Sequence, residues 1–328
     1  MDAKLQRWVQ RQGWDRAVEH YETFWREQLR PAHDAVLDAA GLATGERVID
    51  IACGTGMVTL PAACAVGPTG RVLATDISQR MVDDIARRSR DLGIDNVDVE
   101  RSDAEDLGPL GGEPPGEPTQ CDSAFVSSAE PAEQAKPELD AASGRTHPLR
   151  PTSGFDVALC SLGLMYVPSP AVAVAEVARV LRPGGRVVAA VWGERRNCGW
   201  AEVFPIVDAR VSSDVCPMFF ALGAPGCLAG LVASAGFVDV EEFRISTELV
   251  YIDEDAAIGA AFLGGPVALA HARFDDTTKA SAYDEYLASI EPFRDGAGFR
   301  VPGEFVIVAA RLPQHQTTNT PHTNQEQP

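Results

Sequence analysis

The chain of 328 residues carries 47 acidic and 28 basic side chains, which gives a formal net charge of −19 and a pI near 4.7. Nucleic acids and anionic membranes bind dense basic patches, so this charge opposes both as partners and leaves room only for a local basic groove. Hydrophobic residues make up 45% of the chain, which suits one large α/β domain, with or without an elaborated cap.

The seven cysteines form no C-x-x-C pair, and their odd number favours reduced thiols. Residues 1–22 are charged and amphipathic, unlike the apolar centre of a signal peptide. No apolar run approaches the length of a transmembrane helix. We therefore expect a cytoplasmic protein without a membrane span.

In chain order, residues 15–40 predict a helix that is broken or kinked at Pro31. Short apolar runs and helical patterns then alternate. Strands are expected at 47–52, 71–76, 97–103, 155–162 and 185–192, and helices at 57–66, 78–93 and 170–181. Ser78 is the expected N-cap of the second of these helices. This alternation predicts a parallel sheet with helices on both faces.

Two stretches do not fit that pattern. Residues 108–151 contain eight prolines and five glycines within 44 positions and few large apolar side chains. Such a segment cannot bury enough surface to offset its ordering entropy, so we interpret it as a disordered insertion. The polar tail at 313–328 is of low complexity and is interpreted in the same way.

The stretch VIDIACGTG, residues 48–56, joins a predicted strand to a glycine-rich turn. Glycine adopts positive φ and lets a ligand approach the backbone, so this turn is a candidate binding loop. A dinucleotide fingerprint would have a third glycine where Thr59 stands, and a Walker loop would end in GK[ST]. A tight turn without a ligand is the alternative.

Three successive predicted strands each deliver an acid. The first carries Asp50, the second ends at Asp76, twenty residues after Gly56, and the third ends at Asp103. Because the carboxyl ends of parallel strands meet at one edge of the sheet, these acids are expected around one cleft. Asp76 is placed to accept hydrogen bonds from a ribose diol, and Asp103 from an adenine amine.

Together these motifs resemble those of the class I S-adenosylmethionine-dependent methyltransferases, in particular the small-molecule branch related to ubiquinone and menaquinone biosynthesis (methyltransferase types 11 and 25). VIDIACGTG is similar to their first motif, ATDISQRMV to their ribose motif and RSDAEDL to their adenine motif. Residues 155–193 resemble the motifs that follow. The resemblance covers about 45–110 and 155–311, and the insertion departs from it.

The resemblance implies a Rossmann-like, open, mostly parallel seven-stranded sheet with helices on both faces. It adds a helix and strand over 231–241 and a last strand over 303–311. The expected organisation is an N-terminal helical cap at 1–44 and a methyltransferase domain at 45–312. Two further cap segments are expected within that domain, at about 194–225 and about 252–298.

The implied cofactor is S-adenosyl-L-methionine, which has no phosphate and so needs no anion-binding loop. Gly54 and Gly56 would give its methionine end access to the backbone, and Ile77 and Met81 would flank the adenine. The full set of expected cofactor residues is Asp50, Cys53, Gly54, Thr55, Gly56, Asp76, Ile77, Met81, Asp103, Ala104, Cys160 and Ser161. For Met81 and Cys160, a plain core position is the alternative.

Methyl transfer from a sulfonium depends mainly on alignment and desolvation, so no catalytic acid or base is assigned. The candidates are Tyr21, Tyr166 and His271. Tyr21, Phe24 and Trp25 fall on one helical face, which either covers the cleft as a lid or simply docks the helix. Histidine and cysteine are too scattered to indicate a metal site.

The expected partner is a small-molecule methyl acceptor, which reacts through oxygen, nitrogen, carbon or sulfur. Three alternatives are an enzyme that methylates RNA or protein, a catalytically idle S-adenosylmethionine-binding regulatory protein, and a nicotinamide dehydrogenase. The identity of the acceptor and the oligomeric state are left open.

Overall fold

The computed structural model describes residues 3–109, 154–211 and 218–314. The insertion at 108–151 and the tail at 313–328 lie outside the described residues, apart from the first two residues of each. The strands are β1 (Arg47–Ile51), β2 (Arg71–Asp76), β3 (Val97–Arg101), β4 (Phe155–Ser161), β5 (Leu181–Trp192), β6 (Val238–Tyr251), β7 (Arg294–Asp295) and β8 (Gly298–Arg311).

The α-helices are α1 (Ala3–Ala40), α2 (Thr59–Val66), α3 (Gln79–Asp91), α4 (Pro170–Val180), α5 (Val203–Asp208), α6 (Cys227–Ser234), α7 (Glu254–Ile258), α8 (Ala268–His271) and α9 (Asp276–Ile290). The shorter helical turns are η1 (Leu164–Tyr166), η2 (Arg195–Asn197), η3 (Ala221–Gly223), η4 (Gly259–Leu263) and η5 (Glu291–Phe293).

Seven strands follow the order β3-β2-β1-β4-β5-β8-β6, and the two-residue β7 pairs with β8. The pairs from β3 to β5 are parallel, whereas β8 is antiparallel to both β5 and β6. The predicted open, mostly parallel seven-stranded sheet is confirmed, with β7 as a short addition. The chain winds outward from β1 to β3 and returns to β4. Ligands of such sheets bind beyond the carboxyl ends of the strands at this reversal.

Local sequence patterns account for most element boundaries. All residues of β1 and β2 except the first are buried, as expected for strands that helices cover on both faces. Ser78 caps α3 as predicted, since its Oγ accepts a hydrogen bond from Met81 N at 3.2 Å. Strand β5 begins at Leu181 rather than at Gly185, because Leu181 pairs with Phe155 across a register shift.

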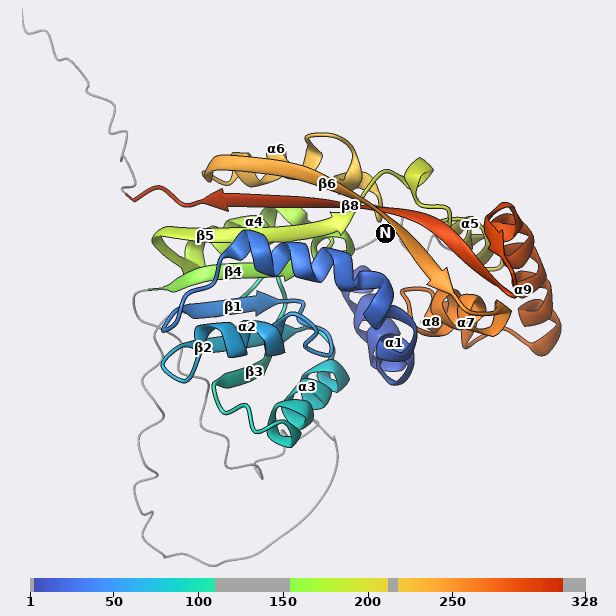
Figure 1. Ribbon diagram of the computed structural model, residues 1–328, viewed down its shortest axis with the longest axis horizontal. Coiled ribbons are helices and arrows are strands. Elements are labelled where there is room, and N and C mark those ends of the chain that lie inside the picture. The colour runs from blue at the N-terminus through green and yellow to red at the C-terminus, as the bar shows by residue number, and fades with distance from the viewer. Residues whose placement is uncertain (1–2, 110–153, 212–217, 315–328) are drawn as a thin grey trace, which may run out of the picture.

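Helix α1 is longer than predicted, since it begins at Ala3 and continues through Pro31. Figure 1 shows this helix, in blue, bending as it passes over the sheet. A proline inside a helix costs about 3 kcal/mol. The apolar side of α1 offsets this cost by packing on the core, with Ala17, Trp25, Leu29, Ala32, Val36 and Ala40 buried. The predicted break at Pro31 therefore does not occur.

The late-chain helices α7, α8 and α9 gather around one end of the long strands β6 and β8, as Figure 1 shows in orange and red. Helix α1 contacts this group through α8 and η4, and it also contacts α3. The sheet, α1 and the late-chain helices share one hydrophobic cluster. The N-terminal helix is thus part of the same core that supports the strand ends.

Candidate cofactor and acceptor site

A cavity with about 750 Å³ of open space lies at the carboxyl ends of β1, β2 and β4, and α1 contributes part of its wall. The predicted cofactor residues that line it are Gly54, Asp76, Ile77, Met81, Asp103, Ala104 and Ser161. The remaining predicted residues are buried and do not line it, namely Asp50, Cys53, Thr55, Gly56 and Cys160.

Asp76 ends β2 with both carboxylate oxygens held by backbone amides. Gly54 N donates to Oδ2 at 3.0 Å, and Ser78 N donates to Oδ1 at 2.8 Å. Burial raises the pKa of Asp76 from 3.8 to about 6, and these amides oppose the rise. The amide of Ile77 is a third backbone donor to this carboxylate, which can accept about four hydrogen bonds, so capacity for a further donor remains.

The glycine loop has positive φ angles at Gly54 (54°) and Gly56 (88°). A Cβ at Gly56 would lie 2.6 Å from Ile85 Cδ1, so α3 approaches this loop more closely than a side chain would allow.

Thr59, which replaces the third glycine of a dinucleotide site, donates its hydroxyl to Asp50 Oδ2 at 2.5 Å. Burial raises the pKa of Asp50 to about 7, and this hydroxyl opposes the rise. Asp50 therefore anchors the start of α2.

Two non-glycine residues with left-handed backbone line the cavity just after β1 and β4, namely Ala52 (φ 56°) and Leu162 (φ 61°). This conformation costs roughly 1–3 kcal/mol and clusters at ligand sites. The next residue, Gly163, has no room for a side chain, since a Cβ would lie 2.5 Å from Ala52 Cβ and 2.9 Å from Cys160 Sγ. Sequence analysis missed all three cavity residues. Of these, only Gly163 carries a signal, as a glycine that closely follows a predicted strand.

Cys160 and Ser161, both predicted at the methionine end, have different surroundings. Ser161 lines the cavity, and its Oγ has no hydrogen-bond partner among the described residues. Cys160 is buried, and burial raises the pKa of its thiol to about 12. Cys160 is therefore a neutral core side chain, whereas the Ser161 hydroxyl is buried in the cavity wall without a partner among the described residues.

The loop after β3 is joined to the first turns of α1. Asp103 Oδ1 accepts a hydrogen bond from Glu105 N at 2.9 Å, and its Oδ2 forms an ion pair with Arg7 Nε at 2.8 Å. Arg7 also pairs with the Glu105 carboxylate. Burial raises the pKa of Asp103, and the Arg7 guanidinium opposes that rise. The role of Arg7 could not be read from the motifs, because it depends on how α1 lies over the loop.

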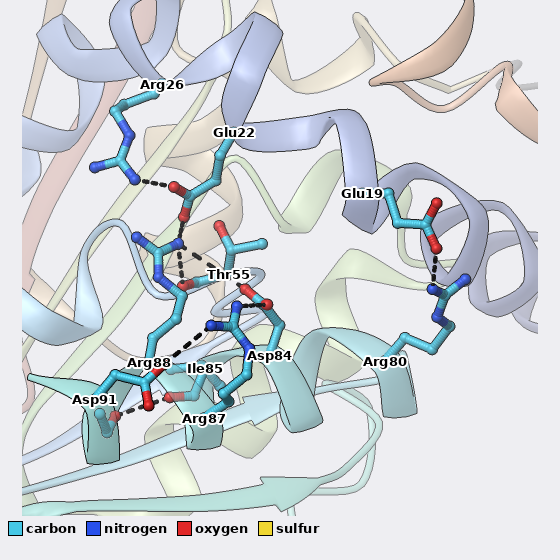
Figure 2. A network of polar contacts seen from close by, with 11 residues as sticks. Glu19, Glu22, Arg26, Thr55, Arg80, Asp84, Ile85, Arg87, Arg88 and Asp91 are labelled. Atoms are coloured by element: carbon cyan, nitrogen blue, oxygen red, sulfur yellow. Dashed lines mark hydrogen bonds and ion pairs between the residues drawn. The ribbon is translucent and has the colours of Figure 1, made fainter.

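Further charged contacts hold α1 against α3 and the glycine loop (Figure 2). Glu19 Oε1 lies 2.5 Å from Arg80 Nη2. Arg88 pairs with Glu22 and donates to the Thr55 carbonyl at 3.2 Å. These contacts connect the polar side of α1 to two elements that shape the cofactor cavity.

Tyr21 and Tyr166, two of the catalytic candidates, line the cavity with Trp14. The Trp14 ring centroid lies 5.5 Å from that of Tyr21 and 5.1 Å from that of Tyr166, both edge to face. Burial raises the pKa of Tyr21 far above its usual value of 10, and the charge of Asp76 adds to this. The Tyr21 hydroxyl is thus not a base. All three rings also line a second, narrow chamber.

The predicted aromatic face of α1 is divided between two environments. Only Tyr21 lines the cofactor cavity. Trp25 lines the second chamber and donates its indole N–H to the Ala260 carbonyl at 3.2 Å. Phe24 packs against Gly259, where a Cβ would lie 2.2 Å from its ring. The spacing placed the rings on one side of the helix correctly, but that side contacts the late-chain helices as well as the cavity. Docking therefore describes Phe24 and Trp25 better than a lid does.

His271, the third catalytic candidate, lines neither the cavity nor the chamber. Its Nε2 lies 2.6 Å from the Tyr283 hydroxyl, and the two rings stack with centroids 5.7 Å apart. Burial lowers the pKa of His271 to about 4, so the ring is neutral near pH 7. Its contacts are structural ones within the late-chain helices, so the structure removes it as a catalytic candidate.

Lys4, Arg7, Arg11 and Arg101 line a shallow groove beside the cavity, so the chain does contain a local basic groove. Within the described ranges, no group of three or more histidine, cysteine, aspartate or glutamate side chains could hold a metal ion. Nor is any described helix long and apolar enough to cross a bilayer.

Comparison with known proteins gives consistent relatives. A family model described as a methyltransferase domain matches residues 49–187. Nocamycin O-methyltransferase from Saccharothrix syringae is 29% identical, over 76% of this chain and 80% of its own length. Demethylmenaquinone methyltransferase from Staphylococcus aureus is 28% identical, over 49% of each chain. The alignment with this second relative thus spans only about half of its length.

Solved structures share the fold at lower identity. The YcgJ protein from Bacillus subtilis is 15% identical with a TM-score of 0.53, over 87% of this chain and all of that one (100%). Phosphoethanolamine N-methyltransferase 2 from Haemonchus contortus, solved in complex with S-adenosyl-L-methionine, is 15% identical with a TM-score of 0.52, over 92% of this chain and 57% of that one. With the strand order described above, the family model and the similarity to Nocamycin O-methyltransferase show an S-adenosylmethionine-dependent methyltransferase of the small-molecule type, with the fold of the class I enzymes.

Proposed function

We propose that this methyltransferase holds S-adenosylmethionine in the cavity beyond β1, β2 and β4, and methylates a small molecule where that cavity meets the second chamber. In this arrangement Asp76 accepts hydrogen bonds from the ribose diol and Asp103 from the adenine amine. Gly54 and Ser161 meet the methionine end. Three further cavity residues flank the adenine, namely Ile77, Met81 and Ala104. The buried residues Asp50, Cys53, Thr55, Gly56 and Cys160 support the shape of the loop and strand ends.

The observation that carries the proposal is a buried Asp76 carboxylate that can accept a further hydrogen bond, in a cavity whose described wall offers no unpaired cation. Arg7 is the single basic residue in its described wall, and Arg7 is paired with Asp103 and Glu105. A pyrophosphate would need an anion-binding site, whereas S-adenosylmethionine carries a positive sulfonium and no phosphate. The partnerless Ser161 Oγ offers a further polar contact to this cofactor.

The cofactor supplies a methyl group on a positively charged sulfur. In the transfer, the acceptor atom bonds to the methyl carbon as the carbon–sulfur bond breaks, sulfur keeps that electron pair, and any acceptor proton passes to bulk water as the methylated product leaves the site. Trp14, Tyr21 and Tyr166 would exclude water around the transferred group and face its positive charge with aromatic rings. Alignment of reactants alone can lower a barrier by about 7–11 kcal/mol, so the wall can act by positioning the acceptor without a base.

The likeness to Nocamycin O-methyltransferase favours an oxygen acceptor. The net charge of −19 opposes a nucleic acid substrate, and the narrow chamber opposes a folded protein substrate. We also propose a cytoplasmic location, which is supported by the free state of the five described cysteines.

Isothermal calorimetry with S-adenosylhomocysteine tests the residue assignment. Asp76→Ala should weaken binding about tenfold or more, because hydrogen bonds to a charged acceptor are worth roughly 1.5–3 kcal/mol. Asp91→Ala, at an exposed position of α3, is the matched control and should bind normally. Unchanged affinity in a folded Asp76→Ala protein would remove Asp76 from the site.

Turnover needs a separate measurement, because binding alone does not distinguish an enzyme from an idle binding protein. Formation of S-adenosylhomocysteine from S-adenosylmethionine, followed across a panel of hydroxylated small molecules, should reveal at least one acceptor. Tight cofactor binding with no turnover on oxygen, nitrogen, carbon or sulfur acceptors would favour the idle regulatory protein instead.

A further inference from the structure

The second chamber opens from the cofactor cavity and has an aromatic wall. Trp14, Tyr21, Leu162 and Tyr166 line both spaces, so the two meet at these residues. Beyond this junction the wall is made mainly of Trp25, Trp192, Trp200 and Phe219. None of the described residues that line the chamber carries a formal charge.

Trp200 lies at the centre of this wall. Its ring centroid lies 4.7 Å from that of Trp192, 5.8 Å from that of Trp25 and 5.7 Å from that of Phe219. Trp200 is only 3% exposed, yet its Nε1–H has no hydrogen-bond partner among the described residues. The neighbouring Trp25 N–H, in contrast, is satisfied by the Ala260 carbonyl. Buried donors are almost always paired, with protein or with ordered water, so the Trp200 N–H has room for a partner that a bound oxygen atom could supply.

We propose that this chamber is the acceptor site, and that it binds a planar, conjugated, uncharged molecule with an oxygen atom that accepts a hydrogen bond from Trp200 Nε1–H. This inference rests on the methyl transfer proposed above, because the chamber meets the cofactor cavity at the wall where the methyl group would leave. It adds the chemical class of the acceptor and the residue that orients it.

The wall explains why the acceptor would be uncharged. A carboxylate or ammonium that entered the chamber would lose its water without gaining an ionic partner, and this loss outweighs what contact with the rings returns. A carbonyl, phenol or ether oxygen loses far less and gains the indole hydrogen bond.

The same wall explains why the acceptor would be flat. Trp25 and Phe219 meet Trp200 edge to face, at interplanar angles of 73° and 84°. A further planar ring placed against these rings makes favourable stacked or edge-to-face contacts. A branched aliphatic chain makes fewer contacts in the same space.

Three probes of similar size separate these features, each titrated by calorimetry into the full chain saturated with S-adenosylhomocysteine. Coumarin is flat and uncharged and has a carbonyl, naphthalene lacks oxygen, and 2-naphthoate carries a charge. Coumarin should bind about five- to tenfold more tightly than naphthalene, and 2-naphthoate should bind most weakly.

Equal binding of coumarin and naphthalene would overturn the hydrogen bond, and tightest binding of 2-naphthoate would overturn the uncharged class. If none of the probes binds while S-adenosylhomocysteine does, the acceptor class is wrong and the cofactor site stands. If S-adenosylhomocysteine itself fails to bind, the proposed function fails.

Two matched variants assign the hydrogen bond to one indole. Trp200→Phe keeps a ring and removes the unpartnered N–H. Coumarin and naphthalene should therefore bind this variant with about equal affinity. Trp25→Phe removes an N–H of the same wall that Ala260 already uses, and it should keep the preference. A preference that survives Trp200→Phe would overturn the proposal.

A second measurement needs no variant and decides the question if Trp200→Phe does not fold. In the native protein with S-adenosylhomocysteine, one of the five tryptophan indole proton resonances should move downfield on addition of coumarin and stay in place with naphthalene. The absence of any such movement in a protein that binds coumarin would overturn the proposed contact.

Discussion

The Arg7 guanidinium on α1 pairs with the Asp103 carboxylate in the loop after β3, its Nε lying 2.8 Å from Oδ2. The first turns of α1 are thereby joined to the predicted adenine end of the cavity. Later turns of the same helix are held by buried residues such as Leu29 and Val36. Exposed ion pairs contribute about 0–1 kcal/mol each, whereas burying a large apolar side chain contributes about 1.5–3 kcal/mol. We therefore expect the N-terminal half of α1 to open before the C-terminal half.

Arg7→Ala should let the cofactor product leave faster. The change removes the pairs with Asp103 and Glu105. The Asp103 pair is partly screened by solvent and contributes roughly 0.2–1 kcal/mol, whereas the Glu105 carboxylate is buried and keeps the hydrogen bond from Ser169 N. The dissociation rate of S-adenosylhomocysteine, measured by stopped flow, should rise about three- to tenfold with little change in melting temperature. Arg30→Ala, which breaks an exposed pair with Glu27 on the same helix, should leave the rate unchanged. Equal rates in all three proteins would contradict a restraining role for Arg7.

Asp50→Asn should stabilise the ligand-free protein at pH 8 but not at pH 5. Burial raises the pKa of Asp50 from 3.8 to about 7. Between these values the folded protein keeps a proton that the unfolded chain has released, so this group lowers the free energy of unfolding as the pH rises. Asparagine still offers an oxygen to Thr59 but never ionises, so the variant avoids that loss.

Thermal unfolding between pH 5 and 8 measures the difference in melting temperature between Asp50→Asn and the native protein. That difference should widen toward pH 8, whereas Asp38→Asn, at an exposed position of α1, should differ from native by a constant amount. The native curve is subtracted because other groups also make the melting temperature depend on pH. Burial lowers the pKa values of His33 and His271 to about 4, so these residues lower the free energy of unfolding as the pH falls. Parallel curves for Asp50→Asn and native protein would mean that burial does not keep Asp50 protonated.

Gly163→Ala should destabilise the strand end that shapes the cavity. The new Cβ would lie 2.5 Å from Ala52 Cβ and 2.9 Å from Cys160 Sγ, so the backbone has to shift. Overpacking of this kind costs about 1–3 kcal/mol. The melting temperature and the affinity for S-adenosylhomocysteine should both fall, because Ala52 and Leu162 line the cavity.

The matched glycine substitution is Gly230→Ala in α6, where nothing lies within 4 Å of an added Cβ. Alanine favours a helix over glycine by about 0.5–1 kcal/mol, so this variant should melt slightly higher and bind normally. A Gly163→Ala protein that melts like native would show that the strand end accommodates a methyl group.

Residues at strand ends could be predicted because each follows from a local pattern. Asp76 and Asp103 come after apolar runs, and a parallel sheet brings such ends together however far apart they are in the chain. The Ser78 cap follows from its position before an amphipathic segment. The open, mostly parallel seven-stranded sheet follows from the family resemblance, and the strand pairing confirms it.

Contacts that depend on the path of α1 could not be predicted. Arg7 meets Asp103, and Trp25 meets Trp200, only because the helix packs against both α3 and the late-chain helices. The left-handed backbone of Leu162 is similar, since leucine has no local preference for that conformation and surrounding packing imposes it. Sequence periodicity gives the face of a helix but not the neighbours that this face meets.

Trp25→Ala and Tyr21→Ala should affect different properties, although the two residues lie one turn apart on α1. Trp25→Ala should lower stability, and Tyr21→Ala should change ligand binding. Trp25 is 5% exposed, and its ring centroid lies 6.1 Å from that of Trp192. Truncating a buried tryptophan costs about 3–5 kcal/mol, so Trp25→Ala should melt far lower while the protein that remains folded binds cofactor normally. Thermal unfolding and calorimetry on the same preparation measure both quantities.

Tyr21→Ala should instead change how the protein distinguishes the cofactor from its product. Tyr21 lines the cofactor cavity, and an aromatic ring near a positive sulfonium contributes about 0.5–2 kcal/mol, which the neutral product does not receive. The affinity for S-adenosylmethionine should therefore fall about three- to tenfold more than that for S-adenosylhomocysteine. Calorimetric titration of both ligands into the same variant measures this ratio, and equal losses would mean that Tyr21 acts only by shape. If Trp25→Ala kept its melting temperature and lost cofactor affinity, Trp25 rather than Tyr21 would be the residue of α1 that closes over the site.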